Sequence, residues 1–220
     1  ARAADLGCGT GWFGLRLLRA GLRTVFLDPS GKMLEQARAA AAAEAARGLD
    51  ATFVQCGLED MDAVADQSLD FATAQGDPLS FCSDAERALR QLHRALRPDA
   101  HVVLSVDNRC AGVRALLDEG AADAALELLR TGRTEWRAQR DAERFAMQMF
   151  DAGELGSLLA RCGFAVASCI GKTCLVQRRH EAALADAAAR QRWLSAEESV
   201  HAQPHWWAAA SHLQIAARRR

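Results

Sequence analysis

The sequence predicts an α/β fold with a doubly wound, mostly parallel sheet of the seven-stranded type, helices on both faces and helical inserts that form a cap. Strand-like and helix-like segments alternate along most of the 220 residues, which is typical of a parallel sheet covered by helices. A glycine-rich turn follows the first expected strand, and an acidic residue, Asp28, ends the second. Turns at the carboxyl ends of parallel strands border the ligand crevice of such sheets, so these residues indicate a binding site there.

The first 107 residues supply the expected strands and helices in regular alternation. Apolar, β-branched runs predict strands, whereas alanine or leucine at helical spacing predicts helices. The expected strands are residues 3–6, 24–27, 52–55, 69–74 and 101–106, and the expected helices are residues 12–20, 29–46 and 83–96. The second of these helices has Pro29 at its first position, where a helix tolerates proline, and stops near Gly48. A turn at Gly76, Asp77 and Pro78 follows the fourth strand.

The second half of the chain alternates less regularly. The expected helices are residues 112–130 and 152–161, and the expected strands are residues 164–170 and 212–217. Two inserts interrupt this part: residues 131–150 mix charged and apolar side chains, and residues 180–210 are mainly helical in pattern. Without an internal repeat or a linker, the sequence predicts a single domain over residues 1–220. Because only a few residues precede the glycine-rich turn, we expect that an N-terminal lead-in segment of the domain is missing.

Composition excludes several classes of protein. Half of the residues are apolar and 25% are charged, as in ordinary folded domains. The net charge of −1 argues against nucleic acid as a partner, since phosphate neutralisation requires clustered lysine and arginine. No apolar run approaches the roughly 20 residues of a membrane-spanning helix. Seven cysteines, an odd number, without a secretory signal predict a reduced, cytoplasmic setting in which most thiols are buried.

The turn after the first expected strand has glycine at every second position, at Gly7, Gly9 and Gly11. Glycine allows a sharp turn and a close approach of ligand to backbone, and N–H groups at a helix start bind carboxylate or phosphate oxygens. A dinucleotide-binding turn reads G-x-G-x-x-G, and its third glycine position is Trp12 here, which counts against NAD or FAD. No Gly-Lys-Ser/Thr follows, so a phosphate-binding P-loop is excluded.

The acidic residue at the end of the second expected strand has two interpretations. The carboxylate of Asp28 can accept two hydrogen bonds from a ribose diol of a ligand in the crevice. Alternatively, Asp28 caps the turn at Pro29 and Ser30 and has only a structural role. The sequence alone leaves both interpretations open.

With these segments in order, the chain resembles the class I, Rossmann-like S-adenosylmethionine-dependent methyltransferases, particularly the group of ubiquinone, menaquinone and small-molecule methyltransferases. The resemblance covers about residues 1–107 and 150–170. The matching segments are DLGCGTG at 5–11, VFLDPS at 25–30, MLEQA at 33–37, SLDF at 68–71, LHRALRP at 92–98 and CGF at 162–164. The order and spacing of this set are more specific than the glycine-rich turn alone.

The resemblance implies S-adenosyl-L-methionine as the cofactor. It implies that the methionine end lies against the glycine-rich turn, the ribose against Asp28, and the sulfonium against Gln75. The full set of residues implied to bind the cofactor is Asp5, Gly7, Cys8, Gly9, Gly11, Asp28, Pro29, Met33, Gly57, Leu58 and Gln75. Where the family often has an aspartate for the adenine amino group, this chain has Gly57, so the Leu58 backbone and Glu59 or Asp60 would have to serve.

Methyl transfer from a sulfonium is a direct displacement, in which the protein aligns the reacting atoms and excludes water. A general base is needed only when the nucleophile holds a proton. Gln75 and Asp77, after the fourth expected strand, are the candidate catalytic residues, and Asp77 is a base, a substrate anchor or simply a turn residue. His180 and His205 are further possible bases, and no metal site is expected.

The sequence therefore predicts methyl transfer to a small-molecule acceptor, with oxygen, nitrogen, carbon and sulfur all open as the methylated atom. The alternative is a catalytically inactive, methyltransferase-like domain that binds the cofactor or a partner. The near-neutral charge disfavours an RNA or protein acceptor. The large apolar residues of the inserts either pack on the sheet or form a lid over an apolar substrate pocket. They are Trp136, Phe145, Met147, Met149, Phe150, Trp193, Trp206 and Trp207.

Overall fold

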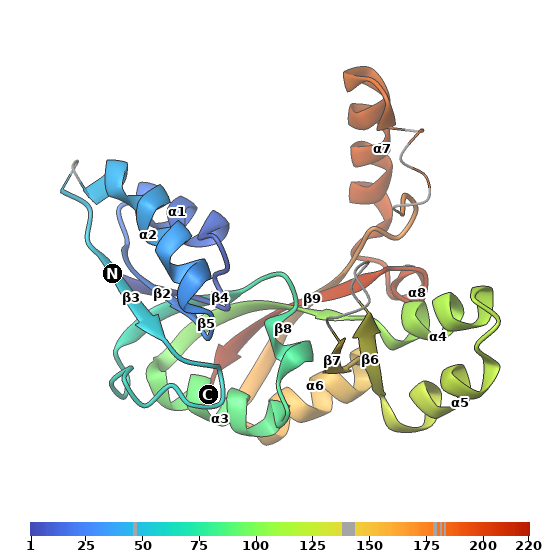
Figure 1. Ribbon diagram of the computed structural model, residues 1–220, viewed down its shortest axis with the longest axis horizontal. Coiled ribbons are helices and arrows are strands. Elements are labelled where there is room, and N and C mark those ends of the chain that lie inside the picture. The colour runs from blue at the N-terminus through green and yellow to red at the C-terminus, as the bar shows by residue number, and fades with distance from the viewer. Residues whose placement is uncertain (46–47, 138–143, 178–179, 181, 183) are drawn as a thin grey trace.

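A seven-stranded sheet forms the centre of the molecule in the computed structural model, which describes residues 1–45, 48–137, 144–177, 180, 182 and 184–220 (Figure 1). The strands are β1 (Arg2–Leu6), β2 (Arg23–Asp28), β3 (Ala51–Gln55), β4 (Leu69–Ala74), β5 (Leu96–Asp107), β8 (Phe164–Lys172) and β9 (His212–Arg219). Their order across the sheet is β3-β2-β1-β4-β5-β9-β8. β1 to β5 are parallel, and β9 is antiparallel to both of its neighbours. The expected mostly parallel, seven-stranded α/β fold is confirmed.

Helices cover both faces of this sheet, as the alternating pattern predicts. On β2, Phe26 points to one face, and its neighbours Val25 and Leu27 point to the other, because side chains alternate along a strand. The Phe26 face packs against α1 (Trp12–Arg19) and α2 (Gly31–Ala45). The opposite face packs against α3 (Ala85–Ala95) and α6 (Ala152–Arg161). The core therefore consists of two apolar clusters that the sheet separates.

Two helix boundaries differ from the prediction. Residues 112–130 were expected to form one helix, but α4 (Arg109–Asp118) and α5 (Ala122–Thr131) are separate. Gly120 lies between them with a φ of 75°, a left-handed conformation that ends a helix and that glycine adopts without steric cost. Pro29 precedes α2 instead of opening it, because the backbone first turns around Asp28 and Ser30.

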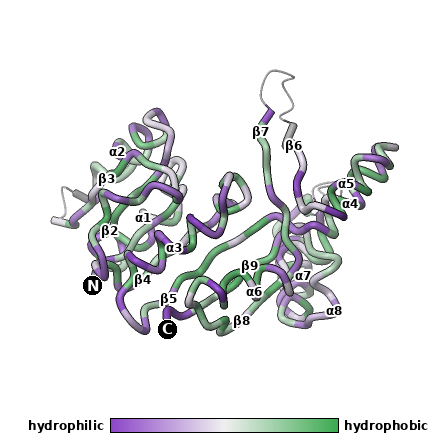
Figure 2. Tube along the Cα trace, turned by 90° about the horizontal axis from the view of Figure 1, so that it is seen from below, coloured by the Kyte–Doolittle hydropathy of each residue, from purple (hydrophilic) through white to green (hydrophobic). Residues whose placement is uncertain are grey.

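The first insert is not helical, which corrects the prediction of helical inserts for this part of the chain. It contains a two-stranded antiparallel hairpin, β6 (Arg133–Arg137) and β7 (Arg144–Gln148), in which Trp136 pairs with Phe145. Figure 2 shows the hairpin standing out from the apolar central strands. Threonine and aromatic residues with charged neighbours give this insert the composition of an exposed hairpin.

The second insert is helical, as expected, and contains α7 (Ala187–Val200) and α8 (Pro204–Trp207). α7 projects away from the sheet in Figure 1. The Glu197 carboxylate fixes its base, because it accepts hydrogen bonds of 2.7–2.9 Å from the backbone N–H groups of Cys174, Leu175 and Val176. Among the described residues, no helix is both long enough and apolar enough to cross a membrane.

Candidate active site

The glycine-rich turn between β1 and α1 requires its glycines for two physical reasons. Gly7, Gly9 and Gly11 all have positive φ values, of 65°, 51° and 89°, which side chains disfavour. In addition, a Cβ atom on Gly7 would lie 2.5 Å from Cβ of Pro78, so the turn after β4 packs directly against the turn after β1. The close packing brings the carboxyl ends of β1 and β4 together.

Asp5, near the end of β1, acts on the turn from inside the protein. Its side chain is buried, and Oδ2 accepts a hydrogen bond of 2.6 Å from the N–H of Gly14 in the first turn of α1. Burial raises the pKa of this carboxyl group to about 6, and the negative charge of Asp28 adds to the increase, while the Gly14 N–H opposes it. Asp5 therefore positions the start of α1 against β1.

Asp28 ends β2 and connects the turn to the sheet edge. Its Oδ2 accepts a hydrogen bond of 2.8 Å from the Gly9 N–H, and its Oδ1 accepts one of 2.9 Å from the Ser30 N–H. Asp28 therefore has a structural role, because its carboxylate holds the backbone of two turns in place. The residue also lines a cavity, so a role toward a ligand is compatible with the same position.

This cavity, of about 640 Å³, lies at the carboxyl edge of β1 to β4. It is lined by Gly7, Gly9, Asp28, Pro29, Ser30, Met33, Gly57, Leu58, Glu59, Gly76, Pro78, Phe81, Cys82 and Phe145. Seven of the residues that the resemblance implied for the cofactor are therefore brought together here. They are Gly7, Gly9, Asp28, Pro29, Met33, Gly57 and Leu58.

The other implied cofactor residues do not line this cavity. Asp5 and Cys8 are buried beneath the turn, and Gly11 packs against Phe26 and Ala37. Gln75 is turned toward β5, where its Nε2 donates a hydrogen bond of 3.2 Å to the carbonyl oxygen of Val103. These four residues support the cavity wall from behind.

The acidic residues after β3 differ in position. Glu59 lines the cavity, but its Oε1 accepts hydrogen bonds of 2.7 Å from the Ser83 hydroxyl and from the Asp84 N–H. Asp60 forms an ion pair with Arg87 and is not among the described residues that line the cavity. Of the two acids considered for the place of the family's aspartate, only Glu59 is near enough.

Apolar side chains form the outer wall. Phe145, from the hairpin, is 48% exposed, and Phe81, from the 3-10 turn Pro78–Phe81, is 44% exposed. In the second insert, Trp207 packs on the core, and Trp193 is 40% exposed on α7. Within the part of the chain that the structure describes, Phe145 is the insert residue that reaches the cavity.

Beside the cavity, Asp77 meets two residues that the sequence analysis did not single out. The distance from His212 Nδ1 is 2.9 Å to Asp77 Oδ2 and 3.5 Å to Asp107 Oδ1. One nitrogen or carboxylate oxygen atom from each of the three side chains lies within 4.8 Å of the other two. We call these three residues the Asp–His cluster. His180 and His205, the possible bases considered from the sequence, lie outside it; His205 is exposed, and His180 Nδ1 accepts a hydrogen bond from the Gln177 N–H.

The three groups of the Asp–His cluster perturb one another. Burial raises the pKa of Asp77, but the hydrogen bond and charge of His212, together with Ser105 and the charge of Lys172, outweigh burial and hold this pKa below its usual range. Burial, together with the charge of Asp77, raises the pKa of Asp107 to about 6. Contact with Asp77 raises the pKa of His212 against the opposing effect of burial. The imidazolium is therefore favoured between the two carboxyl groups.

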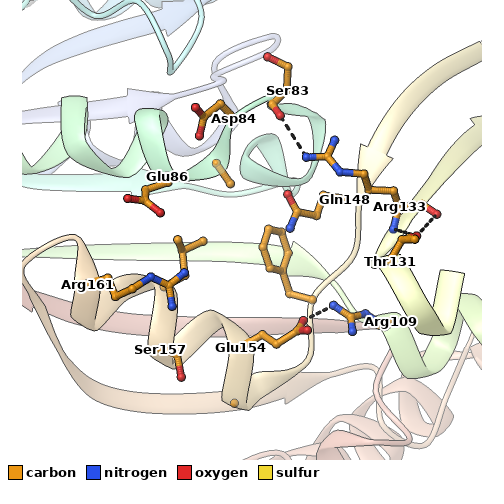
Figure 3. A pocket seen from close by; sticks show the side chains of 14 residues that line it. Ser83, Asp84, Glu86, Arg109, Thr131, Arg133, Gln148, Glu154, Ser157 and Arg161 are labelled. Carbon is orange, nitrogen blue, oxygen red and sulfur yellow. Dashed lines mark hydrogen bonds and ion pairs between the residues drawn. The ribbon is translucent and has the colours of Figure 1, made fainter.

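A second cavity, of about 760 Å³, lies between the start of α3, α6 and the base of the hairpin (Figure 3). Two of the three arginines that line it have partners: Arg109 pairs with Glu154, and Arg133 donates a hydrogen bond of 3.4 Å to the carbonyl oxygen of Ser83. None of the residues implied for the cofactor lines it. The cavity at the glycine-rich turn is therefore the candidate site.

Known proteins resemble this chain in part of its sequence and in its fold. The family described as "Methyltransferase domain" matches residues 3–99. A malonyl-[acyl-carrier protein] O-methyltransferase of Erwinia pyrifoliae is 36% identical over 111 residues, which are 47% of this chain and 36% of that protein. The match therefore spans little more than a third of the relative's length.

Solved structures share the fold over the whole chain. An S-adenosylmethionine-dependent methyltransferase of Methanosarcina mazei has a TM-score of 0.68 at 20% identity, covering 99% of this chain and 92% of that one. The 1,6-didemethyltoxoflavin-N1-methyltransferase of Burkholderia thailandensis, solved with S-adenosylhomocysteine, has a TM-score of 0.59 at 18% identity, covering 100% and 71%. At these identities the similarity is one of fold.

Proposed function

We propose that this chain is a class I, Rossmann-like S-adenosylmethionine-dependent methyltransferase and that it transfers the cofactor's methyl group to a small-molecule acceptor by direct displacement. The observation that carries the proposal is the cavity at the carboxyl edge of the sheet. It combines the backbone of Gly7 and Gly9 with the carboxylate of Asp28 and the apolar side chains of Met33 and Leu58.

In this proposal, each part of the cavity recognises one part of the cofactor. The glycine-rich turn takes the amino acid end, because its backbone is accessible without a side chain in the way. The Asp28 carboxylate accepts hydrogen bonds from the ribose hydroxyls, since each of its oxygens has a lone pair beyond those used by Gly9 and Ser30. Pro29, Met33 and Leu58 enclose the adenine ring.

The sulfonium would then lie toward Gly76 and Pro78, the lining residues on either side of Asp77. S-adenosylmethionine supplies an activated methyl group, so the chain's own task is to align the acceptor and exclude water. Phe81 and Phe145 serve this task as an apolar wall on the open side of the cavity. A small-molecule acceptor fits the similarity to the protein named 1,6-didemethyltoxoflavin-N1-methyltransferase, whereas the relative named malonyl-[acyl-carrier protein] O-methyltransferase is named for an acyl group on a carrier protein.

Calorimetric titration tests the cofactor assignment directly. S-adenosylhomocysteine is expected to bind with a dissociation constant in the micromolar range, or about −8 kcal/mol. Folded protein that releases no heat at millimolar ligand would contradict the assignment. Binding without any labelled methyl transfer to an acceptor panel would instead favour the catalytically inactive alternative.

Hydrogen exchange tests the role of the inserts. Saturating S-adenosylhomocysteine is expected to slow exchange in the glycine-rich turn and in β7, because Phe145 contributes to the wall of the cavity. α7 provides the internal comparison, since none of its residues lines the cavity, and its exchange is expected to be unchanged. If β7 does not respond while the turn is protected, the hairpin is not part of the cofactor site.

A further inference from the structure

The Asp–His cluster lies at the same edge of the sheet as the proposed cofactor site. Asp77 follows β4, Asp107 ends β5 and His212 opens β9. Because β9 is antiparallel to β5, its first residue lies at the same sheet edge as the last residue of β5, and the register pairs Asp107 with His212. Gly76 and Pro78, on either side of Asp77, line the cofactor cavity, so the cluster is connected to the cavity wall through the residues that flank Asp77.

The His212 ring has one buried and one accessible edge. Nδ1 is buried and faces Asp77 and Asp107, yet the side chain as a whole is 35% exposed. The exposed part is therefore the edge away from Nδ1, which carries Nε2. Two carboxyl groups beside Nδ1 favour the proton on that nitrogen, and the lone pair of Nε2 is then available to a ligand.

The rest of the cluster is built to hold this arrangement. The Ser105 hydroxyl accepts hydrogen bonds of 3.2 Å from the N–H groups of Gly76 and Asp77. The Ser80 hydroxyl accepts one of 3.0 Å from the Asp107 N–H. Both aspartates are thus fixed through their backbone, as a positioned acid–base group requires.

One further charge faces the cluster. Lys172 ends β8, is paired with His212 in the strand register and influences the titration of all three cluster groups. Its positive charge opposes the binding of a metal cation beside it. Among the described residues, the charges that face His212 are therefore those of Asp77, Asp107 and Lys172. Together they favour a proton on His212 over a metal cation beside it.

We propose that His212 is the catalytic base of the methyl transfer, that Asp77 and Asp107 orient it, and that the acceptor is a neutral compound with a reactive O–H or ring N–H group. This proposal rests on the proposed function. In the step, the acceptor atom forms a bond to the methyl carbon, and the methyl–sulfur bond breaks with its electron pair going to sulfur. The acceptor's proton moves to Nε2 of His212 and is later released to water. An acceptor that is already anionic, such as a carboxylate, would need no such base.

The protonation of His212 sets the pH dependence. Contact with Asp77 raises the pKa of His212 above its ordinary value of 6.5. Because the neutral ring is the active form, the rate is expected to rise with pH through this raised pKa. In Asp77→Asn the negative partner is lost, so the pKa of His212 falls and the rising limb moves to lower pH.

Nuclear magnetic resonance of protein labelled with ¹⁵N-histidine tests the cluster without an acceptor. The His212 ring is expected to titrate above 6.5 in the wild type and at lower pH in Asp77→Asn. His101→Asn is the matched control, because His101 is exposed and opposes Arg218 at the other end of the β5–β9 pair. Equal titration of His212 in the wild type and in Asp77→Asn would overturn the proposed coupling.

A labelled-methyl assay on phenols, ring N–H heterocycles and carboxylates tests the role in transfer. His212→Asn is expected to lower kcat for phenols or heterocycles by about 100-fold or more, the usual contribution of a general base. Its affinity for S-adenosylhomocysteine should stay within twofold, and His101→Asn should match the wild type. Activity confined to carboxylates, full activity of His212→Asn, or loss of wild-type activity with EDTA would each overturn the proposal. A wild type that neither binds the cofactor product nor methylates any acceptor would contradict the proposed function itself.

Discussion

Replacing Gly14 with alanine is expected to destabilise the protein by about 1–3 kcal/mol, the usual cost of overpacking a core. A Cβ atom on Gly14 would lie 2.2 Å from Cε1 of Phe26 and 2.6 Å from its Cδ1. The Phe26 ring cannot move aside easily, because it is fully buried and stacks on Phe53 with ring centroids 4.9 Å apart. A shift of α1 instead would strain the hydrogen bond between Gly14 N–H and Asp5.

Chemical denaturation of a matched pair of variants measures this effect. Gly156 also lies within a helix, α6, but a Cβ atom there would meet nothing within 4 Å. Gly156→Ala is therefore expected to stabilise the protein by about 0.5–1 kcal/mol through helix propensity alone. The double variant with Phe26→Leu should recover part of the loss at Gly14. If both alanine variants change the free energy of unfolding in the same direction, the result would contradict the close packing of α1 on β2 at Gly14.

Replacing Asp28 with alanine is expected to weaken S-adenosylhomocysteine binding by about 1.5–3 kcal/mol, the range for hydrogen bonds to a charged group. The variant also loses the contacts to Gly9 and Ser30, so a decrease in stability of about 1 kcal/mol is expected, as for a lost cap. Calorimetry on protein shown to be folded separates the two effects.

The controls for this prediction are Asp28→Asn and Asp60→Ala. Asparagine keeps one oxygen for a backbone N–H but loses the charge, so it should recover more stability than affinity. Asp60 pairs with Arg87 outside the cavity, and its replacement should leave affinity unchanged. An Asp28→Ala variant that binds as tightly as the wild type per folded molecule would leave Asp28 with only its structural role.

Much of the fold could be predicted because, in the first half of the chain, the hydrophobic pattern of each segment agrees with its burial in the folded protein. β2, for example, has an apolar run from Val25 to Leu27, as strands buried on both faces do, and it ends in Asp28, the acid that lines the cavity. The hairpin was missed because its strands are short and Met147 is the one buried side chain of β7, so the sequence there has no clear alternation of apolar and polar residues.

The partners of Asp77 could not be predicted from neighbouring residues. His212 lies 135 positions away in the sequence, and it meets Asp77 only because the last strand runs against the others. The useful signal would have been the combination of acids at the ends of two parallel strands with a histidine at the start of the final strand. The orientation of the Gln75 side chain, away from the cavity, could not be predicted either, because it depends on a hydrogen bond to a carbonyl oxygen of β5.

The hydrogen bonds that Glu197 accepts from three successive backbone N–H groups have a consequence for the position of α7. α7 projects from the molecule, and its base is hydrogen-bonded to the segment that starts two residues after Lys172. These hydrogen bonds therefore restrain the position of α7 relative to the segment that follows β8.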